Sequence, residues 1–378
     1  MKLILAVPIT LVMVYRAWSR ATLTHAGIVA AILTAGAHAI HPWNLPFGLL
    51  ITFFLAGTRV TKIKHDLKSK LTIQASGDVG KESSRTHVQV FANSGVASVL
   101  SILHTYVLKQ RGENMCHPWP GSLLFIGIVA NYAAVAADTF SSELGILSKS
   151  RPRLITSLRL RKVPPGTNGG VTSMGLAAAF LGSFIIVLTS ILLTPFCQFS
   201  RPVNMKDSYR AWTFADKLWF LILMTLWGAL GSLLDSFLGG WLQQSVVDVR
   251  YGKIIEGSGG KRVLLENLRN KVSTDTLQED LSHKGEVGKQ NSKLLEDSDS
   301  LSPTFNNKPR AKTDVKENIN ERIQSVGSKA LKMNPDIAVE SGSLALLDNN
   351  EVNFVMALTM SVGAMVIACL TLQVPMST

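Results

Sequence analysis

Residues 121–145 read GSLLFIGIVANYAAVAADTFSSELG, an apolar run that ends in a cluster of polar side chains. No charged residue occurs in 121–137, and a helix that crosses the hydrocarbon of a bilayer needs about 20 mostly apolar residues. The stretch therefore predicts a membrane-spanning helix whose polar end carries Asp138 and Glu143.

Seven other apolar stretches accompany this one. They are 3–15, 25–41, 44–57, 88–108, 171–196, 217–247 and 352–374. Only the fourth, fifth and seventh of these are clearly long and uninterrupted, and Asp235 is expected to interrupt 217–247. We predict an all-α fold, a polytopic membrane helix bundle of about seven to eight spans. The first stretch could be part of a cleaved signal peptide, but Arg16 and Arg20 lie where cleavage would fall, so a retained helix is expected.

Composition supports the same class of protein. Apolar residues make up 47% of the 378 residues and charged residues 17%, whereas soluble domains usually carry about 25% charged residues. This balance excludes a disulfide-rich secreted domain, a coiled coil and a simple soluble enzyme. Because aromatic and basic residues do not alternate in any segment, we expect no nucleic-acid partner.

One polar segment divides the membrane domain. Residues 256–340 hold 14 basic and 14 acidic residues and few apolar ones, so the segment lacks the apolar surface needed to offset the entropy of ordering. We predict a disordered cytosolic insert, with a short helix near 312–332 as an alternative for part of it. The membrane domain then comprises 1–255 and a last span within 341–378.

Basic residues indicate the orientation. If the eight stretches alternate in direction, 17 lysine and arginine residues outside the insert lie on one side and seven on the other. The side richer in basic residues is expected to be cytosolic, in an endomembrane. Cys116 and Cys197 then share the non-cytosolic side, where they form either a disulfide or two unrelated thiols.

The polar end of 121–145 is the first candidate site. Asp138 and Ser142 share one helix face, whereas Glu143 points away from it unless the helix breaks. A carboxylate in a membrane span is costly and therefore indicates function. Carboxylates and hydroxyls suit Mg²⁺, which also bridges to substrate phosphates; the alternative is a polar helix end that caps itself.

A glycine-rich loop is the second candidate. Gly166-Thr167-Asn168-Gly169-Gly170 precedes the apolar run that starts near residue 174, and Lys162 lies just upstream. Backbone N–H groups of such a loop can face a phosphate. The loop also suits a simple helix cap, with Thr172 or Ser173 as the capping residue, and both interpretations can hold.

Three further polar residues lie where spans meet the basic side. Asp235 lies in a segment that echoes the Asp138 motif, Asn93 starts a span, and Asn349 lies at the entry to the last span. A pocket of carboxylates, amides and cations would suit a phosphorylated ligand.

Ordered motif blocks resemble the transmembrane protein 19 family, which is related to the plant phytyl-phosphate kinase. The blocks are Gly57–Lys62, Val88–Gly95, Asp138–Gly145, Pro152–Thr156, Gly166–Thr172 and Leu347–Asn350. The resemblance implies a polytopic fold and, for the kinase branch, transfer of a phosphoryl group from a nucleotide to an isoprenoid phosphate. The acidic and glycine-rich blocks are also similar to dolichol kinase and the CDP-diacylglycerol synthases, except that Pro165 stands where the lipid kinases have Glu.

We therefore hypothesise a lipid-phosphate kinase with a membrane lipid and a nucleoside triphosphate as partners. Mg²⁺ is expected on Asp138, Asp235 and Glu143. Asp138, Lys162 and Asn93 are the candidate catalytic residues, and Gly166, Thr167, Asn168, Gly169, Gly170 and Asn349 are the candidate binding residues. The alternative is a non-enzymatic membrane protein or an ion-coupled transporter on the same fold.

Overall fold

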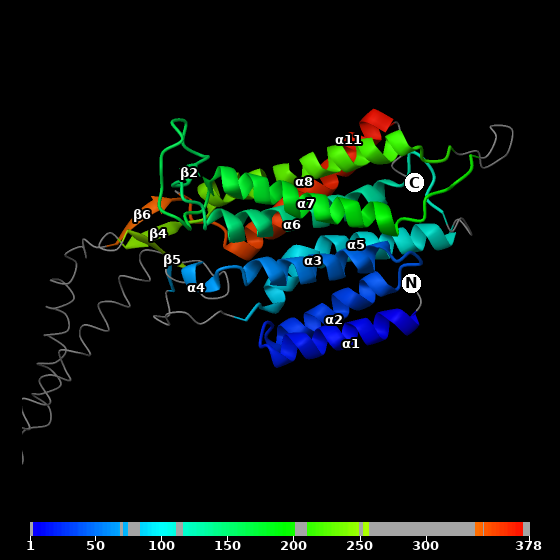
Figure 1. Ribbon diagram of the computed structural model, residues 1–378, viewed down its shortest axis with the longest axis horizontal. Helices are drawn as coiled ribbons and strands as arrows, with labels where there is room; N and C mark the ends of the chain where they lie inside the picture. Colours follow the sequence, from blue (N-terminus) through cyan, green and yellow to red (C-terminus); the bar gives the residue numbers. More distant parts are fainter. Residues whose placement is uncertain are drawn as a thin grey trace, which may run out of the picture. The chain divides into compact units, whose positions relative to one another are not determined.

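The computed structural model describes residues 3–68, 71–74, 84–110, 116–200, 210–248, 252–256, 337–342 and 344–372. Eight helices of at least 15 residues dominate this part of the chain and lie side by side (Figure 1). They are α1 (Leu3–Ser19), α2 (His25–Ala39), α3 (Leu45–Thr61), α5 (His87–Gln110), α6 (Leu123–Gly145), α7 (Ser173–Leu193), α8 (Phe214–Leu242) and α11 (Asn349–Leu372).

The predicted class of fold is confirmed. Helices α5, α6, α7, α8 and α11 are long and apolar enough to cross a membrane, and α1, α2 and α3 are shorter apolar helices. Each helix matches one predicted stretch. The predicted insert lies outside the described residues except at its two edges, as does the helix expected near 312–332.

Helix α6 lies at the centre of the bundle. It contacts α3, α5, α7, α8 and α11, and 83% of its most apolar window is buried. Small residues permit this close packing: a Cβ atom on Gly228 would lie 2.9 Å from the backbone of Ala133, and one on Gly231 would lie 3.0 Å from Ala134 Cα. The helix that carries Asp138 is thus the most enclosed of the five long ones.

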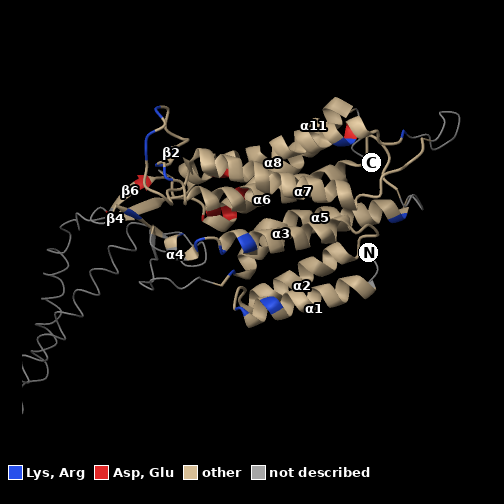
Figure 2. Ribbon diagram, viewed as in Figure 1, with Lys and Arg blue, Asp and Glu red and all other residues tan. Residues whose placement is uncertain are grey.

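Chain direction alternates from helix to helix, so the loops separate into two groups. The loops that follow α1, α3, α6 and α8 lie at one end of the bundle, which we call the basic end; Figure 2 shows lysine and arginine gathered there. Contacts between these loops confirm the grouping: Leu23 bridges Arg85, and Lys68 pairs with Glu143. The cytosolic orientation of this end stays a prediction.

Short strands also lie at the basic end, and the sequence did not predict them. One four-stranded sheet has the order β1 (Thr72–Gln74), β5 (Lys253–Glu256), β4 (Ser245–Asp248) and β6 (Ile337–Ser341). A second pairs β2 (Arg153–Leu154) with β3 (Gly170–Val171) in antiparallel register. Strands of two to five residues are too short to show an alternating pattern.

Two expectations about 217–247 were wrong. Helix α8 continues through Asp235 without a break and spans 29 residues. It ends at Leu242, and Ser245–Asp248 forms β4 instead of extending the span. Asp235 is tolerated inside the helix because neighbouring helices supply polar partners, described below.

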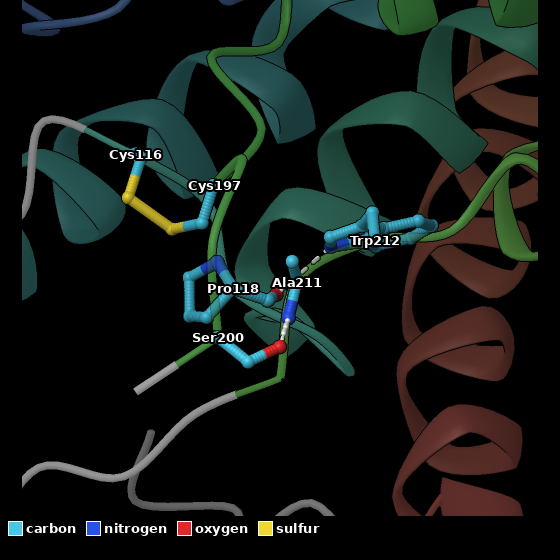
Figure 3. Close-up of a disulfide and its surroundings, with 6 residues drawn as sticks. All are labelled: Cys116, Pro118, Cys197, Ser200, Ala211 and Trp212. Atoms are coloured by element: carbon cyan, nitrogen blue, oxygen red, sulfur yellow. Dashed lines mark hydrogen bonds between the residues drawn. A yellow bond between two sulfur atoms is a disulfide. The ribbon is translucent and has the colours of Figure 1, made fainter. Parts of the chain in front are cut away.

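The opposite end, formed by the loops that follow α2, α5 and α7, carries a disulfide between Cys116 and Cys197 (Figure 3). The structure therefore forms the bridge and not two unrelated thiols. Trp212 packs nearby, and its Nε1 donates a hydrogen bond to Pro118 O at 3.0 Å. We call this end the disulfide end.

A candidate phosphate site at the basic end

The centre of the candidate site is a pair of carboxyl groups from two helices. Asp138 of α6 and Asp235 of α8 are both half-buried, and their side chains hydrogen-bond to each other. A hydrogen bond between two carboxyl groups needs a proton on one of them, or a cation must take the place of that proton. The pair is therefore suited to hold a proton or a metal ion inside the bundle.

A third helix contributes an amide to this pair. When its amide is oriented to satisfy its neighbours, Asn353 Nδ2 donates to Asp235 Oδ1 at 3.0 Å and to Asn349 O at 3.1 Å. Asn353 lies on α11, one turn after Asn349. Residues from α6, α8 and α11 thus meet at one point, although more than 200 residues separate Asp138 from Asn353.

Glu143 does not join the pair. Its Oε2 accepts a hydrogen bond from Lys68 Nζ at 2.6 Å, and the same ammonium group donates to Val60 O and Thr61 O at the end of α3. Helix α6 is continuous to Gly145, so Glu143 points away from the face of Asp138, as the helical spacing predicts. Among the described residues, no three His, Cys, Asp or Glu side chains form a metal-binding group.

The glycine-rich loop packs directly against α8 beside Asp235. A Cβ atom on Gly169 would lie 2.6 Å from Gly240 Cα and 3.0 Å from Ser236 O. Gly169 also has a φ of +83°, a region that favours glycine. Both constraints require glycine here, so this residue type holds the loop against the helix that carries Asp235.

The loop uses part of its backbone for its own structure. The N–H groups of Thr167 and Gly170 donate to Pro164 O and Thr167 O, and that of Asn168 donates to Ser245 Oγ. Within the described part of the chain, the N–H groups of Gly166 and Gly169 have no acceptor. A phosphate at this loop would therefore meet two free N–H groups and not five.

The cap that follows the loop belongs to Thr172. Its Oγ1 accepts a hydrogen bond from Gly175 N at 2.9 Å at the start of α7. Of the two capping residues considered from the sequence, the structure selects Thr172 over Ser173. The helix cap and the glycine loop are adjacent and coexist.

The other predicted site residues lie at the same end, and their contacts are with residues other than Asp138 and Asp235. Lys162 is exposed and bridges Arg153 through the backbone. The side chain of Asn349 is exposed, and only its carbonyl joins the cluster. Asn93 lies on α5, where its carbonyl oxygen accepts a hydrogen bond from Asn131 Nδ2 at 3.0 Å.

Most cations of the basic end have no carboxylate partner in the described residues. The described residues form three ion pairs, and two of them, Lys68–Glu143 and Arg161–Glu340, lie at the basic end. Exposed side chains without such a partner include those of Arg59, Lys62, Arg153, Arg159 and Lys162. The result is a surface suited to anions, next to a buried carboxyl pair.

Sequence reasoning missed two amides, Asn353 and Asn131, and did not single out Arg85, whose Nη2 donates a hydrogen bond to Thr61 Oγ1 at 2.9 Å at the basic end. Asn353 follows Asn349 by one helical turn, and Asn131 precedes Asp138 by two turns on the same face, so helical spacing could have identified both. Arg85 was grouped with the basic loops, and nothing in its sequence context separates it from them.

The five long apolar helices define the class of protein, an integral membrane protein. The chain belongs to the Integral membrane protein DUF92 family, which it matches over residues 8–361. It is 33% identical to Protein PGR of Arabidopsis thaliana over 247 residues, which cover 65% of this chain and 80% of that protein. It is also 35% identical over 145 residues to an uncharacterized membrane protein of Methanocaldococcus jannaschii, over 38% of this chain and 52% of that protein.

These matches confirm the resemblance drawn from the ordered motif blocks and the location in a membrane. No solved structure matches the chain.

Proposed function

We propose that this protein is a nucleotide-dependent lipid-phosphate kinase that acts on an isoprenoid phosphate. The observation that carries the proposal is the contact between Asp138 and Asp235. The glycine loop packs on α8 at Ser236, the residue that follows Asp235. Carboxylates, a glycine loop and unpaired cations are the groups that phosphoryl transfer uses to position and neutralise charge.

The reaction needs no covalent step on the protein. An oxygen of the lipid monophosphate attacks the γ-phosphorus of the nucleotide and forms a new P–O bond. The bond from that phosphorus to the β–γ bridging oxygen breaks, and the nucleoside diphosphate leaves with the electron pair. The lipid diphosphate is the product, so the chain has to align the two phosphates and hold their charge.

The described residues divide this work. Asp138 and Asp235 fit Mg²⁺, which prefers carboxylate oxygens and keeps several water or phosphate ligands; when bound, it would neutralise charge on the phosphates. Lys162 and the neighbouring arginines would hold the nucleotide phosphates through charge-assisted hydrogen bonds. Asn93 and Asn349 would position the acceptor, whereas Glu143 is committed to Lys68 and has no part in this proposal.

A direct assay tests the proposal. Purified protein in detergent is incubated with ATP or CTP, Mg²⁺ and prenyl monophosphates, and lipid diphosphate is measured by mass spectrometry. We expect diphosphate from the wild type and none from Asp138→Asn. Absence of product with every nucleotide and prenyl phosphate would refute the kinase.

One observation favours a second function, an ion-coupled transporter. Two carboxyl groups in contact between spans α6 and α8 are also suited to bind and release a proton or another cation. Substrate-dependent flux into liposomes that disappears in Asp138→Asn, together with no diphosphate formation, would support the transporter over the kinase.

A further inference from the structure

An apolar cavity lies among α1, α2, α3 and α5, apart from the carboxyl pair. Its enclosed volume is about 90 Å³, and it opens to the outside on one side, so it can hold part of a larger ligand whose remainder extends through the opening. Twelve of its 18 lining residues are apolar, among them Met13, Ile28, Leu50 and Phe54. A cavity of this composition suits part of a hydrocarbon chain.

The polar lining residues are concentrated along α5. Gln89 and Asn93 lie one turn apart on the same face of α5, and Arg85, two residues before the helix begins, also lines the cavity; we call these three residues the polar stripe. The side-chain oxygen of Asn93 is buried and has no hydrogen-bond partner in the described residues. Arg85 is the only charged residue in the lining, so the cavity is apolar with a single positive charge.

Arg85 has hydrogen-bonding capacity to spare. One guanidinium nitrogen, Nη2, donates to Thr61 Oγ1 at 2.9 Å, and no carboxylate pairs with the side chain in the part of the chain that the structure describes. A guanidinium group carries five N–H donors in a fork that matches phosphate oxygens. The half-buried Arg85 is therefore suited to bind one anionic headgroup.

Two chains of contacts join this stripe to the helix that carries Asp138. Asn93 O accepts from Asn131, two turns before Asp138, while Thr61 beside Arg85 also accepts from Lys68, the partner of Glu143. The contacts reach α6 on both sides of Asp138 along the chain. The polar stripe therefore lies at the same depth in the bundle as the carboxyl pair.

We propose that this cavity binds the part of an isoprenoid monophosphate nearest its headgroup, with the phosphate at Arg85 and the rest of the hydrocarbon chain extending through the opening. The assignment of this lipid as the phosphoryl acceptor rests on the proposed function; its binding does not. Isoprenoid chain and phosphate match the two parts of the cavity, the apolar chamber and its one cation.

Photolabelling locates the ligand. Full-length protein in nanodiscs without nucleotide is labelled with a diazirine-bearing prenyl phosphate, and labelled peptides are mapped by mass spectrometry. We expect labels on the cavity walls of α1, α2, α3 and α5 that geranylgeranyl phosphate competes away. Labels elsewhere, or labels that do not compete, would overturn the proposal.

Two variants test the two halves of the cavity. Ala31→Trp fills the chamber and should weaken binding of geranylgeranyl phosphate by at least about tenfold, whereas Leu33→Trp, exposed on the same helix and outside the lining, should not. Arg85→Gln keeps the backbone hydrogen bonds to Thr22 and Thr24. It should weaken the binding of geranylgeranyl phosphate by about tenfold and leave the binding of geranylgeraniol unchanged. Arg59→Gln, exposed at the same end, is its control.

The outcomes separate this inference from the kinase. Binding that needs Ala31 and Arg85 without any diphosphate formation supports the cavity and refutes the kinase. Diphosphate formation that neither variant changes, with labels outside the cavity, supports the kinase and refutes the cavity. Asp138→Asn should bind the probe like the wild type, because Asp138 does not line the cavity.

Discussion

The two ends of this helix bundle differ in the partners of their carboxyl groups. At the disulfide end, Arg210 donates two hydrogen bonds to Asp216, at 2.7 and 3.0 Å, and Asp216 raises the pKa of Arg210 above its usual value. At the basic end, carboxyl groups meet each other, and most cations have no carboxylate partner among the described residues. Among the described residues, the carboxylate of the disulfide end, Asp216, is thus paired with a cation, whereas Asp138 and Asp235 are paired with each other; Lys109 and Lys217 at the disulfide end have no carboxylate partner either.

This contrast suggests a division of labour. Charges that are matched within the chain contribute to stability, modestly where they are exposed. Carboxyl groups that have no cation partner inside the bundle cost stability unless a ligand or a proton completes them, so they indicate binding. We therefore expect substitutions at the basic end to change activity and those at the disulfide end to change stability alone.

The largest expected effect is that of Asp235→Asn. Loss of one member of the carboxyl pair should lower diphosphate formation by at least about 100-fold, because the charge that positions the phosphates is reduced. Arg210→Gln is the control at the other end and should leave turnover within about twofold of wild type while costing at most ~1 kcal/mol of stability. Equal losses of turnover in both variants would contradict the division of labour.

A smaller effect is expected from Gly169→Ala. The left-handed φ of +83° costs an L-residue about 1–2 kcal/mol, and the clash with Gly240 and Ser236 adds about 1–3 kcal/mol. We expect a loss of about 3 kcal/mol in the free energy of unfolding, measured by denaturant titration in detergent, and a loss of turnover because the loop leaves α8.

Gly252→Ala is the matched control for that prediction. Gly252 also has a positive φ, +60°, but a Cβ atom there would have no neighbour within 4 Å. Gly252→Ala should lower the free energy of unfolding by only about 1 kcal/mol and leave turnover unchanged. If both variants lower the free energy of unfolding by the same amount, the contact between the glycine loop and α8 contributes nothing to stability.

The sequence predicted the helices because each span has a long apolar run. Positions 121–137 alone contain no charge over 17 residues, and alternation of direction then grouped the loops correctly. The short strands escaped prediction since their hydrogen bonds join distant segments, as in the pairing of Ile73 with Ile255. A two- to five-residue strand depends on its partner and not on its own pattern.

The site was predicted in part for a similar reason. Membrane burial makes a carboxylate conspicuous, so Asp138 and Asp235 could be identified separately. Their contact depends on how α6 packs on α8, which small residues such as Gly228 and Gly231 determine. Glu143 was included with them by proximity in the chain, although the helical repeat placed it on another face, where Lys68 reaches it.

A moderate effect is expected from loss of the disulfide. Chain entropy for a separation of 81 residues corresponds to about 4.5 kcal/mol. Because α6 and α7 lie between the two cysteines and already restrict that segment in the membrane, we expect about 2 kcal/mol. The Cys116→Ser, Cys197→Ser double variant should unfold at lower denaturant and keep wild-type turnover. Loss of turnover at a temperature where the variant is folded would contradict the expectation that the disulfide end affects stability alone.

The smallest effect expected concerns His117, which is buried at the disulfide end against Phe125 with ring centroids 4.2 Å apart. Burial lowers the pKa of His117 to about 3. An unfolded histidine binds its proton near pH 6.5, so between these values the unfolded state binds more protons. Stability should therefore fall as the pH falls through about 6.5, with a slope from this residue that approaches about 1.4 kcal/mol per pH unit well below pH 6.5.

His117→Phe removes this proton uptake and keeps a ring in the same aromatic cluster, where Nε2 has no hydrogen-bond partner among the described residues. The wild type should lose about 1 kcal/mol more than the variant between pH 6.5 and 5.5, measured as the shift of the unfolding midpoint in detergent. Turnover at pH 7 should be equal in the two proteins, because His117 lies at the disulfide end. Parallel pH profiles would show that His117 is protonated alike in both states, and a change in turnover would show that the two ends are coupled.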